Sequence, residues 1–175
     1  MPPTLLTHRL ELRPFAPEDV EELLDLFTDV DVRRYLLDDQ VVTRDWVQAE
    51  VTASVERFAS GSAGLWALRE RGSAAIVGFA GFRPFFDPPE LQLLYGLLPA
   101  YWGRGLATAA ARAAIEHAFG TLGLDEVRAA TDLPNSASIA VLERLDFVEW
   151  RRTDDGGHGT IFFRSVRSGP AFRTT

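Results

Sequence analysis

Two glycines flank one arginine at Gly103-Arg104-Gly105, directly before an alanine-rich segment. Glycine lacks a Cβ atom, so the backbone can turn sharply there and come close to a ligand. A helix that begins at such a turn directs unpaired N–H groups and the positive end of its dipole into one space. Phosphate is the usual occupant of such a space. We therefore predict an anion site here, to which Arg104 would add a fixed positive charge.

An apolar strand and a helix must hold these glycines in place. The segment 91–98 is almost wholly apolar, which is typical of a strand buried on both faces, and Pro99 ends it. From Leu106 on, small and apolar residues recur at helical spacing. A further strand is predicted over 126–131, so strand, crossover helix and strand form a βαβ unit with its two strands adjacent and parallel. Ligands of such units bind beyond the carboxyl ends of the strands.

Other readings of the glycine turn are weaker or fail. A lone Gly-x-Gly before a helix can be an ordinary turn. The dinucleotide-binding fingerprint needs a third glycine, but Thr108 occupies that position, and residues 99–102 intervene between strand and turn. A Walker phosphate-binding loop is excluded because the chain contains no Gly-Lys-Ser/Thr sequence.

The run YGLLPAYWGRGLAT resembles the acetyl-CoA signature of the GNAT-type N-acetyltransferases, especially their RimJ/RimL-like branch. The family pattern of Gln or Arg, two residues, Gly, one residue, and Gly or Ala falls on 102–107, with Trp102 in the first position. The segment from Asn135 to Phe147 resembles a second signature of the family, with Asp146 in place of the expected glycine. The segment from Arg9 to Pro14 resembles the first strand of the same branch.

The resemblance implies an α/β GNAT fold, with a mixed and mostly antiparallel central sheet, one parallel strand pair and helices on both faces. It implies a GNAT domain over 8–167, followed by a polar carboxyl-terminal tail over 168–175. It also implies acetyl-CoA as co-substrate and no metal. The residues expected to bind the cofactor are Leu97, Leu98, Gly103, Arg104, Gly105, Leu106, Ala107, Thr108, Asn135 and Ser138.

The implied reaction is direct transfer of an acetyl group to a primary amine, without an acyl-enzyme. The thioester oxygen needs a donor as it gains charge, and backbone N–H groups near Leu97 and Leu98 are the candidates. Many family members protonate the leaving thiolate with a tyrosine, but Leu142 stands at that position. Ser138 is the nearest hydroxyl and our candidate; the alternative is that it only bonds the backbone of the first helical turn.

The base that removes the amine proton is the open point. Several relatives carry Glu on the central strand where this chain has Gln92, which cannot take a proton. Glu90 lies two residues away on the same strand face, but could be only an exposed carboxylate at the strand end. A water chain would suffice more easily for an α-amino group, with a pKa of about 8, than for lysine at about 10.4. This favours a peptide N-terminus or a small amine as acceptor. The segment 31–42 could either cover the acceptor site or be a solvated loop.

Composition narrows the function further. The 175 residues carry a net charge of −7, which argues against nucleic-acid binding. All 18 basic residues are Arg, so any basic side chain on a phosphate must be Arg. The absence of Cys excludes disulfides and thiolate chemistry. With no 18-residue apolar run and no cleavable signal, we expect a cytoplasmic protein that does not bind membranes, as a monomer or homodimer.

Two rival functions stay open at this level. One is a non-catalytic acyl-CoA-binding module, which the residues Gln92 and Leu142 would suit. The other is a ribosomal-protein N-terminal acetyltransferase proper, which would need a wide groove for a protein tail.

Overall fold

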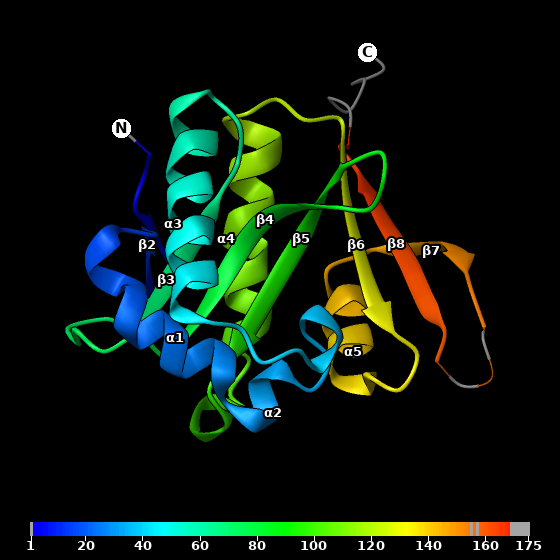
Figure 1. Ribbon diagram of the computed structural model, residues 1–175. Helices are drawn as coiled ribbons and strands as arrows, with labels where there is room; N and C mark the ends of the chain where they lie inside the picture. Colours follow the sequence, from blue (N-terminus) through cyan, green and yellow to red (C-terminus); the bar gives the residue numbers. More distant parts are fainter. Residues whose placement is uncertain (1, 155, 157, 169–175) are drawn as a thin grey trace, which may run out of the picture.

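One mixed sheet forms the middle layer of the protein (Figure 1). The computed structural model describes residues 2–154, 156 and 158–168 of the chain. The strands are β1 (Leu5–Leu6), β2 (Leu10–Pro14), β3 (Leu65–Glu70), β4 (Gly78–Phe85), β5 (Glu90–Leu97), β6 (Glu126–Asp132), β7 (Val148–Arg152) and β8 (Thr160–Val166). Their order in the sheet is β1-β2-β3-β4-β5-β6-β8-β7. Within the described residues, β5 and β6 are the parallel pair and the other neighbours are antiparallel, which confirms the predicted sheet.

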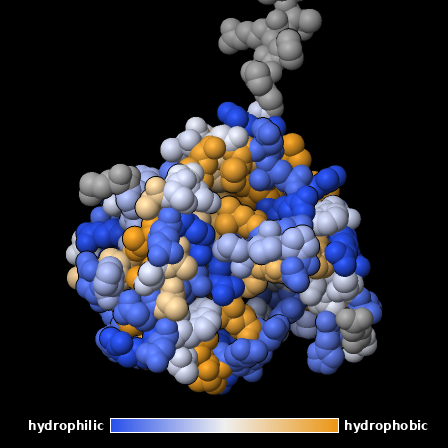
Figure 2. All heavy atoms as spheres, turned by 45° about the horizontal axis from the view of Figure 1, so that its top comes forward, coloured by the Kyte–Doolittle hydropathy of each residue, from blue (hydrophilic) through white to orange (hydrophobic). Residues whose placement is uncertain are grey.

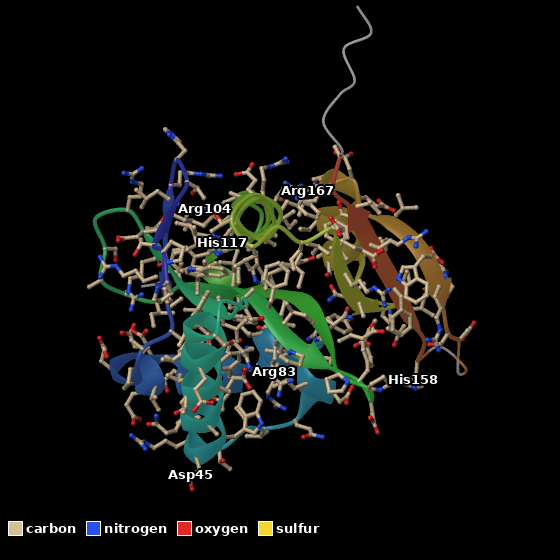
Figure 3. All side chains as sticks on the ribbon, turned by 90° about the horizontal axis from the view of Figure 1, so that it is seen from above. Asp45, Arg83, Arg104, His117, His158 and Arg167 are labelled. Atoms are coloured by element: carbon tan, nitrogen blue, oxygen red, sulfur yellow. The ribbon has the colours of Figure 1, made fainter. Side chains whose placement is uncertain are left out.

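Helices cover both faces of this sheet, as predicted. They are α1 (Val20–Thr28), α2 (Val30–Arg33), α3 (Arg44–Ala59), α4 (Leu106–Gly120) and α5 (Ser136–Arg144). Apolar residues of α1 and α3 pack on one face around Phe79, whereas those of α4 and α5 pack on the other face with Leu93. Figure 3 looks along α4 and shows it and α3 on opposite sides of the sheet.

The helix α3 starts where the sequence predicts but presents a slightly different face. Thr43 caps it, accepting a hydrogen bond from the N–H of Trp46 at 3.1 Å. Helical spacing in the sequence predicts an apolar face of Val47, Val51, Val55 and Phe58, but Val55 is 42% exposed. Ser54 is buried instead, and its hydroxyl accepts from the N–H of Leu65 at 2.7 Å. This face of the helix therefore combines apolar packing of Val47 and Val51 with a hydrogen bond to the start of β3.

The strands β5 and β6 separate after a short contact. Their register pairs Gln92 with Arg128, and beyond this point the carboxyl ends of the strands diverge, with α5 beside the gap (Figure 1). The sheet therefore opens beside the amino-terminal end of α4, where the βαβ unit predicts a ligand.

In the part of the chain that is described, none of the helices is long and apolar enough to span a bilayer. The face turned forward in Figure 2 is mostly polar, with hydrophobic residues in separate patches. The predicted tail lies outside the described residues apart from Ser168, so the boundary at 167 stays a prediction.

Candidate active site

A cavity of about 700 Å³ occupies the gap between β5 and β6. It is bounded by the last residues of both strands, by the glycine turn with the start of α4, and by α5. The amino-terminal half of the chain closes a further side with Asp31, Val32, Arg34, Tyr35 and Leu36. The segment 31–42 thus contributes to the cavity wall, which favours the covering role over a solvated loop.

The glycine turn adopts the conformation for which glycine is needed. Gly103 and Gly105 have φ values of +70° and +71°, and Gly105 is the N-cap of α4. No side chain caps this helix, so N–H groups of its first turn are left for a ligand. Both glycines line the cavity together with Leu106, Ala107 and Thr108. This uncapped turn, bare of Cβ atoms, suits the pyrophosphate of a CoA thioester.

The side chain of Arg104 has a carboxylate partner of its own. Its guanidinium lies 2.8 Å from Oε1 of Glu70 and 5.5 Å from the ring centre of Tyr101, on the side of α4 nearest the amino-terminal strands (Figure 3). It is absent from the cavity lining. In this structure the guanidinium of Arg104 pairs with Glu70, so its contact with a phosphate stays a prediction, whereas its backbone lies in the glycine turn itself.

Of the two backbone N–H groups at the end of β5 that could donate to the thioester oxygen, one is free to do so. The N–H of Leu98 donates to the carbonyl of Val77 at 2.9 Å and is not available. Hydrogen bonding alternates along an antiparallel pair, so the N–H of Leu97 faces the gap instead. The carbonyl of Leu97 accepts from Nε1 of Trp102 at 2.8 Å, which fixes this peptide against the glycine turn.

A pair of hydroxyl groups bridges the gap. The side chain of Asn135 accepts from the N–H of Ser138 at 3.2 Å and caps α5. The Oγ of Ser138 lies 2.9 Å from the phenolic oxygen of Tyr95 on β5, and both residues line the cavity. Burial raises the pKa of Tyr95 to about 12, although its hydrogen bond with Ser138 acts in the opposite direction. Tyr95 therefore keeps its proton at neutral pH. Sequence reasoning missed this tyrosine, although it stands within the signature run.

The predicted acid–base candidates on β5 are hydrogen-bonded to each other and to a neighbouring arginine. Glu90 accepts from Nη1 of Arg128 at 3.0 Å and from Nε2 of Gln92 at 3.3 Å. Gln92 is 3% exposed, and its Oε1 has no hydrogen-bond partner among the described residues. The structure thus brings Glu90 and Gln92 together, with a free amide oxygen on Gln92 and a carboxylate on Glu90 that is largely engaged.

Another carboxylate stands at the opened end of β6. Asp132 follows Thr131, which lines the cavity. Desolvation and the nearby charge of Asp38 raise the pKa of Asp132 above its usual range. A raised carboxyl pKa is what a general base for an amine needs. Its position at the carboxyl end of a predicted parallel strand was the available sequence signal.

The residues around Asp38 hold an unusual backbone. Leu37, Asp38 and Asp39 have φ values of 51°, 56° and 58°, in the left-handed region that non-glycine residues rarely adopt. Each such residue costs on the order of 1 kcal/mol. Strain of this kind concentrates at ligand sites, and the segment that carries it includes Asp38, whose charge acts on Asp132. In the described part of the chain no group of three or more His, Asp or Glu residues could hold a metal ion.

A model of the acetyltransferase (GNAT) domain matches residues 9–148. The chain belongs to the GNAT acetyltransferase family. It is an acetyl-CoA-dependent N-acetyltransferase, and its cavity agrees with that assignment.

Individual relatives support the same family. The uncharacterised N-acetyltransferase p20 of Bacillus licheniformis is 28% identical over 82% of each chain. The FsC-acetyl coenzyme A-N(2)-transacetylase of Aspergillus fumigatus is 31% identical over 80% of this chain, which spans 63% of that protein. Among solved structures, an acetyltransferase of Agrobacterium tumefaciens has a TM-score of 0.79 at 23% identity, covering 94% of this chain and 95% of that one. A RimL ribosomal L7/L12 alpha-N-protein acetyltransferase in complex with coenzyme A has a TM-score of 0.78 at 17% identity, with coverage of 94% and 97%.

Proposed function

We propose that this GNAT enzyme acetylates a primary amine, either a peptide N-terminus or a small amine, by direct attack on acetyl-CoA in a ternary complex. One observation carries the proposal: a single cavity joins the uncapped start of α4, the free edge of β5 and the hydroxyl of Ser138. These three features would serve as the pyrophosphate site, the donor to the thioester oxygen and the donor to the leaving sulfur.

Backbone groups do most of the binding. The N–H groups from Gly105 to Thr108 would hold the pyrophosphate, as the positive end of the helix dipole favours. Asn135 would meet the pantetheine arm with the part of its amide that does not cap α5. The N–H of Leu97 would donate to the thioester oxygen, whose charge grows in the transition state.

Ser138 is the proposed partner of the leaving sulfur. When the amine attacks, the new C–N bond forms and the C–S bond breaks. Ser138 would donate a hydrogen bond to the developing thiolate and keep its own proton, the amine proton would pass to a base or to water, and the thiolate would leave and be protonated from water. Because a CoA-like thiol has a pKa of about 8.5, a hydrogen bond to the developing thiolate stabilises it at neutral pH.

The acceptor amine would enter from the side of α2. Gln92 precedes the lining residue Leu93 but does not itself line the cavity, so its unpartnered Oε1 is not a direct contact for the amine. Glu90 orients that amide and could receive a proton only through water, since Arg128 engages its carboxylate. Asp132, whose pKa is raised, is a second candidate for the base; like Glu90 it does not line the cavity, so it too would receive the proton through water.

The test is release of free CoA from acetyl-CoA with a set of amines. The set contains peptides with a free N-terminus, the same peptides blocked at the N-terminus but carrying lysine, polyamines and amino acids. We expect turnover with a free N-terminus or a small amine and little with the lysine of blocked peptides. Turnover confined to ribosomal-protein tails would identify a ribosomal-protein N-terminal acetyltransferase instead.

A further inference from the structure

The guanidinium of Arg9 contacts the back of the glycine turn. Its Nη2 donates a hydrogen bond to the carbonyl oxygen of Arg104. The same nitrogen lies 3.6 Å from the point that a Cβ on Gly105 would occupy. Arg9 is not among the residues that line the cavity, so it contacts the turn from outside the proposed cofactor site.

The backbone of Arg9 is fixed, so its side chain reaches the turn from a defined place. The carbonyl of Arg9 accepts from the N–H of Arg71 at 3.0 Å, and Thr7 closes the adjacent turn with Leu10. The strands β1 and β2 and the helix α4 therefore meet at this residue.

This contact orients a cofactor-binding amide. In a trans peptide, the carbonyl oxygen and the next N–H point in opposite directions. Holding the carbonyl of Arg104 on the side of Arg9 therefore directs the N–H of Gly105 to the cavity side. The turn has no side-chain cap that could do this instead.

The charge of Arg9 adds a second effect. Among the described residues no carboxylate pairs with Arg9, whereas Arg104 is paired with Glu70. A cation beside a helix N-terminus is disfavoured by the helix dipole, and an anion bound in front of the helix offsets that repulsion. Arg9 thus brings a positive charge to the glycine turn, where the sequence led us to expect the charge of Arg104.

We propose that Arg9 is a positioning residue for the cofactor, which holds the Arg104–Gly105 peptide in its phosphate-binding orientation and supplies the local positive charge. This role rests on the proposed acetyl-CoA site. It concerns the phosphates of the cofactor and not the amine or the transfer step.

Calorimetry of CoA binding tests the role without an acceptor. We expect Arg9→Gln to weaken CoA binding at least about tenfold, the scale of one charge-assisted hydrogen bond. Binding of S-acetylpantetheine, which lacks the pyrophosphate, should be unchanged in Arg9→Gln, and the dependence of CoA affinity on salt should become shallower. Arg9→Lys should recover part of the affinity. The matched control is Arg112→Gln, which removes an exposed charge farther along α4 and should bind CoA as the wild type does.

The possible results separate the role of Arg9 from the cofactor site on which it depends. Equal CoA affinity of the wild type, Arg9→Gln and Arg112→Gln would overturn the role of Arg9 but leave the proposed function standing. Equal weakening by both Gln variants would reduce the effect to net charge and would also overturn it. A wild-type protein that binds no CoA would overturn the proposed site and this role together. Thermal melting of each variant checks that the fold is retained.

Discussion

The phenolic oxygen of Tyr95 lies 2.9 Å from Oγ of Ser138, so a strand and a helix that part at the cavity are joined by two hydroxyl groups. With its pKa raised to about 12, Tyr95 acts as a donor at neutral pH. The phenolic oxygen also lies 3.2 Å from the carbonyl oxygen of Ser138, which can only accept, so Tyr95 can donate to either oxygen of Ser138; when it donates to Oγ, the single proton of Ser138 is free to point at the cofactor sulfur.

We therefore predict that Ser138→Ala lowers kcat by about 100-fold, the lower end for a positioned hydrogen-bond donor. Tyr95→Phe should lower kcat by about tenfold, and the double variant should be no slower than Ser138→Ala, because both act on one step. A thioester with a more acidic leaving thiol should shrink both defects. Tyr101→Phe, which removes another hydroxyl from the same cavity lining, is the control. The shared role of Tyr95 and Ser138 would be contradicted if the losses in kcat simply added in the double variant and did not depend on the acidity of the leaving thiol.

Gly105→Glu should abolish measurable CoA binding. The new side chain would start toward Arg9, place a negative charge beside the phosphate site and force a non-glycine residue to φ +71°. Gly105→Ala carries the same backbone strain without the charge and should retain weaker binding. Calorimetry separates the two effects, and unchanged affinity in Gly105→Glu would refute the site.

The acid limb of the pH–rate profile should report Asp132. Its carboxyl must be ionised to accept a proton, and desolvation and Asp38 raise its pKa. Activity should therefore fall as the pH drops through a value above the ordinary range for Asp, about 3.9. Asp132→Asn should lose most of kcat, whereas Asp38→Asn should move the limb to lower pH. A limb that stays in place in Asp38→Asn would exclude Asp132 as its source.

Stability should decline in mild acid because of His117. Burial lowers the pKa of this residue, which packs edge-on against Trp66 with ring centres 5.4 Å apart. Above the unfolded pKa of about 6.5 the group is neutral in both states. Below it the unfolded state takes up a proton first, so the free energy of unfolding decreases until the folded pKa is passed. His117→Phe should flatten this slope in urea titrations between pH 5.5 and 7.5, and an unchanged slope would assign it elsewhere.

A buried ion pair anchors the start of α1. Nη2 of Arg69 lies 2.6 Å from Oδ1 of Asp19, with side chains 8% and 6% exposed. Asp19→Asn would leave the guanidinium without a counter-charge and should cost about 3–5 kcal/mol of unfolding free energy. Glu21→Gln breaks an exposed pair with Arg44 at the same distance and should cost less than about 1 kcal/mol. Similar losses in the two variants would contradict the role of burial.

The sequence predicted β5, the glycine turn and α4, because glycine, proline and the spacing of apolar residues determine local backbone structure. The direction of Arg104 could not be foretold, since its partner Glu70 comes from a distant strand. The contact of Tyr95 with Ser138 joins residues 43 apart and depends on the opening of the sheet. Asp146 replaces the family glycine and still adopts φ 61°, so the departure there left the turn intact.

The central claim is that the cavity catalyses acetyl transfer rather than only holding an acyl-CoA. The most direct measurement is the rate of free CoA release from acetyl-CoA with the amine set, for wild type and Ser138→Ala. We expect amine-dependent release of CoA by the wild type, and a rate about 100-fold lower in the variant. Tight binding of acetyl-CoA with no release above background for any amine would contradict this claim and identify a binding module.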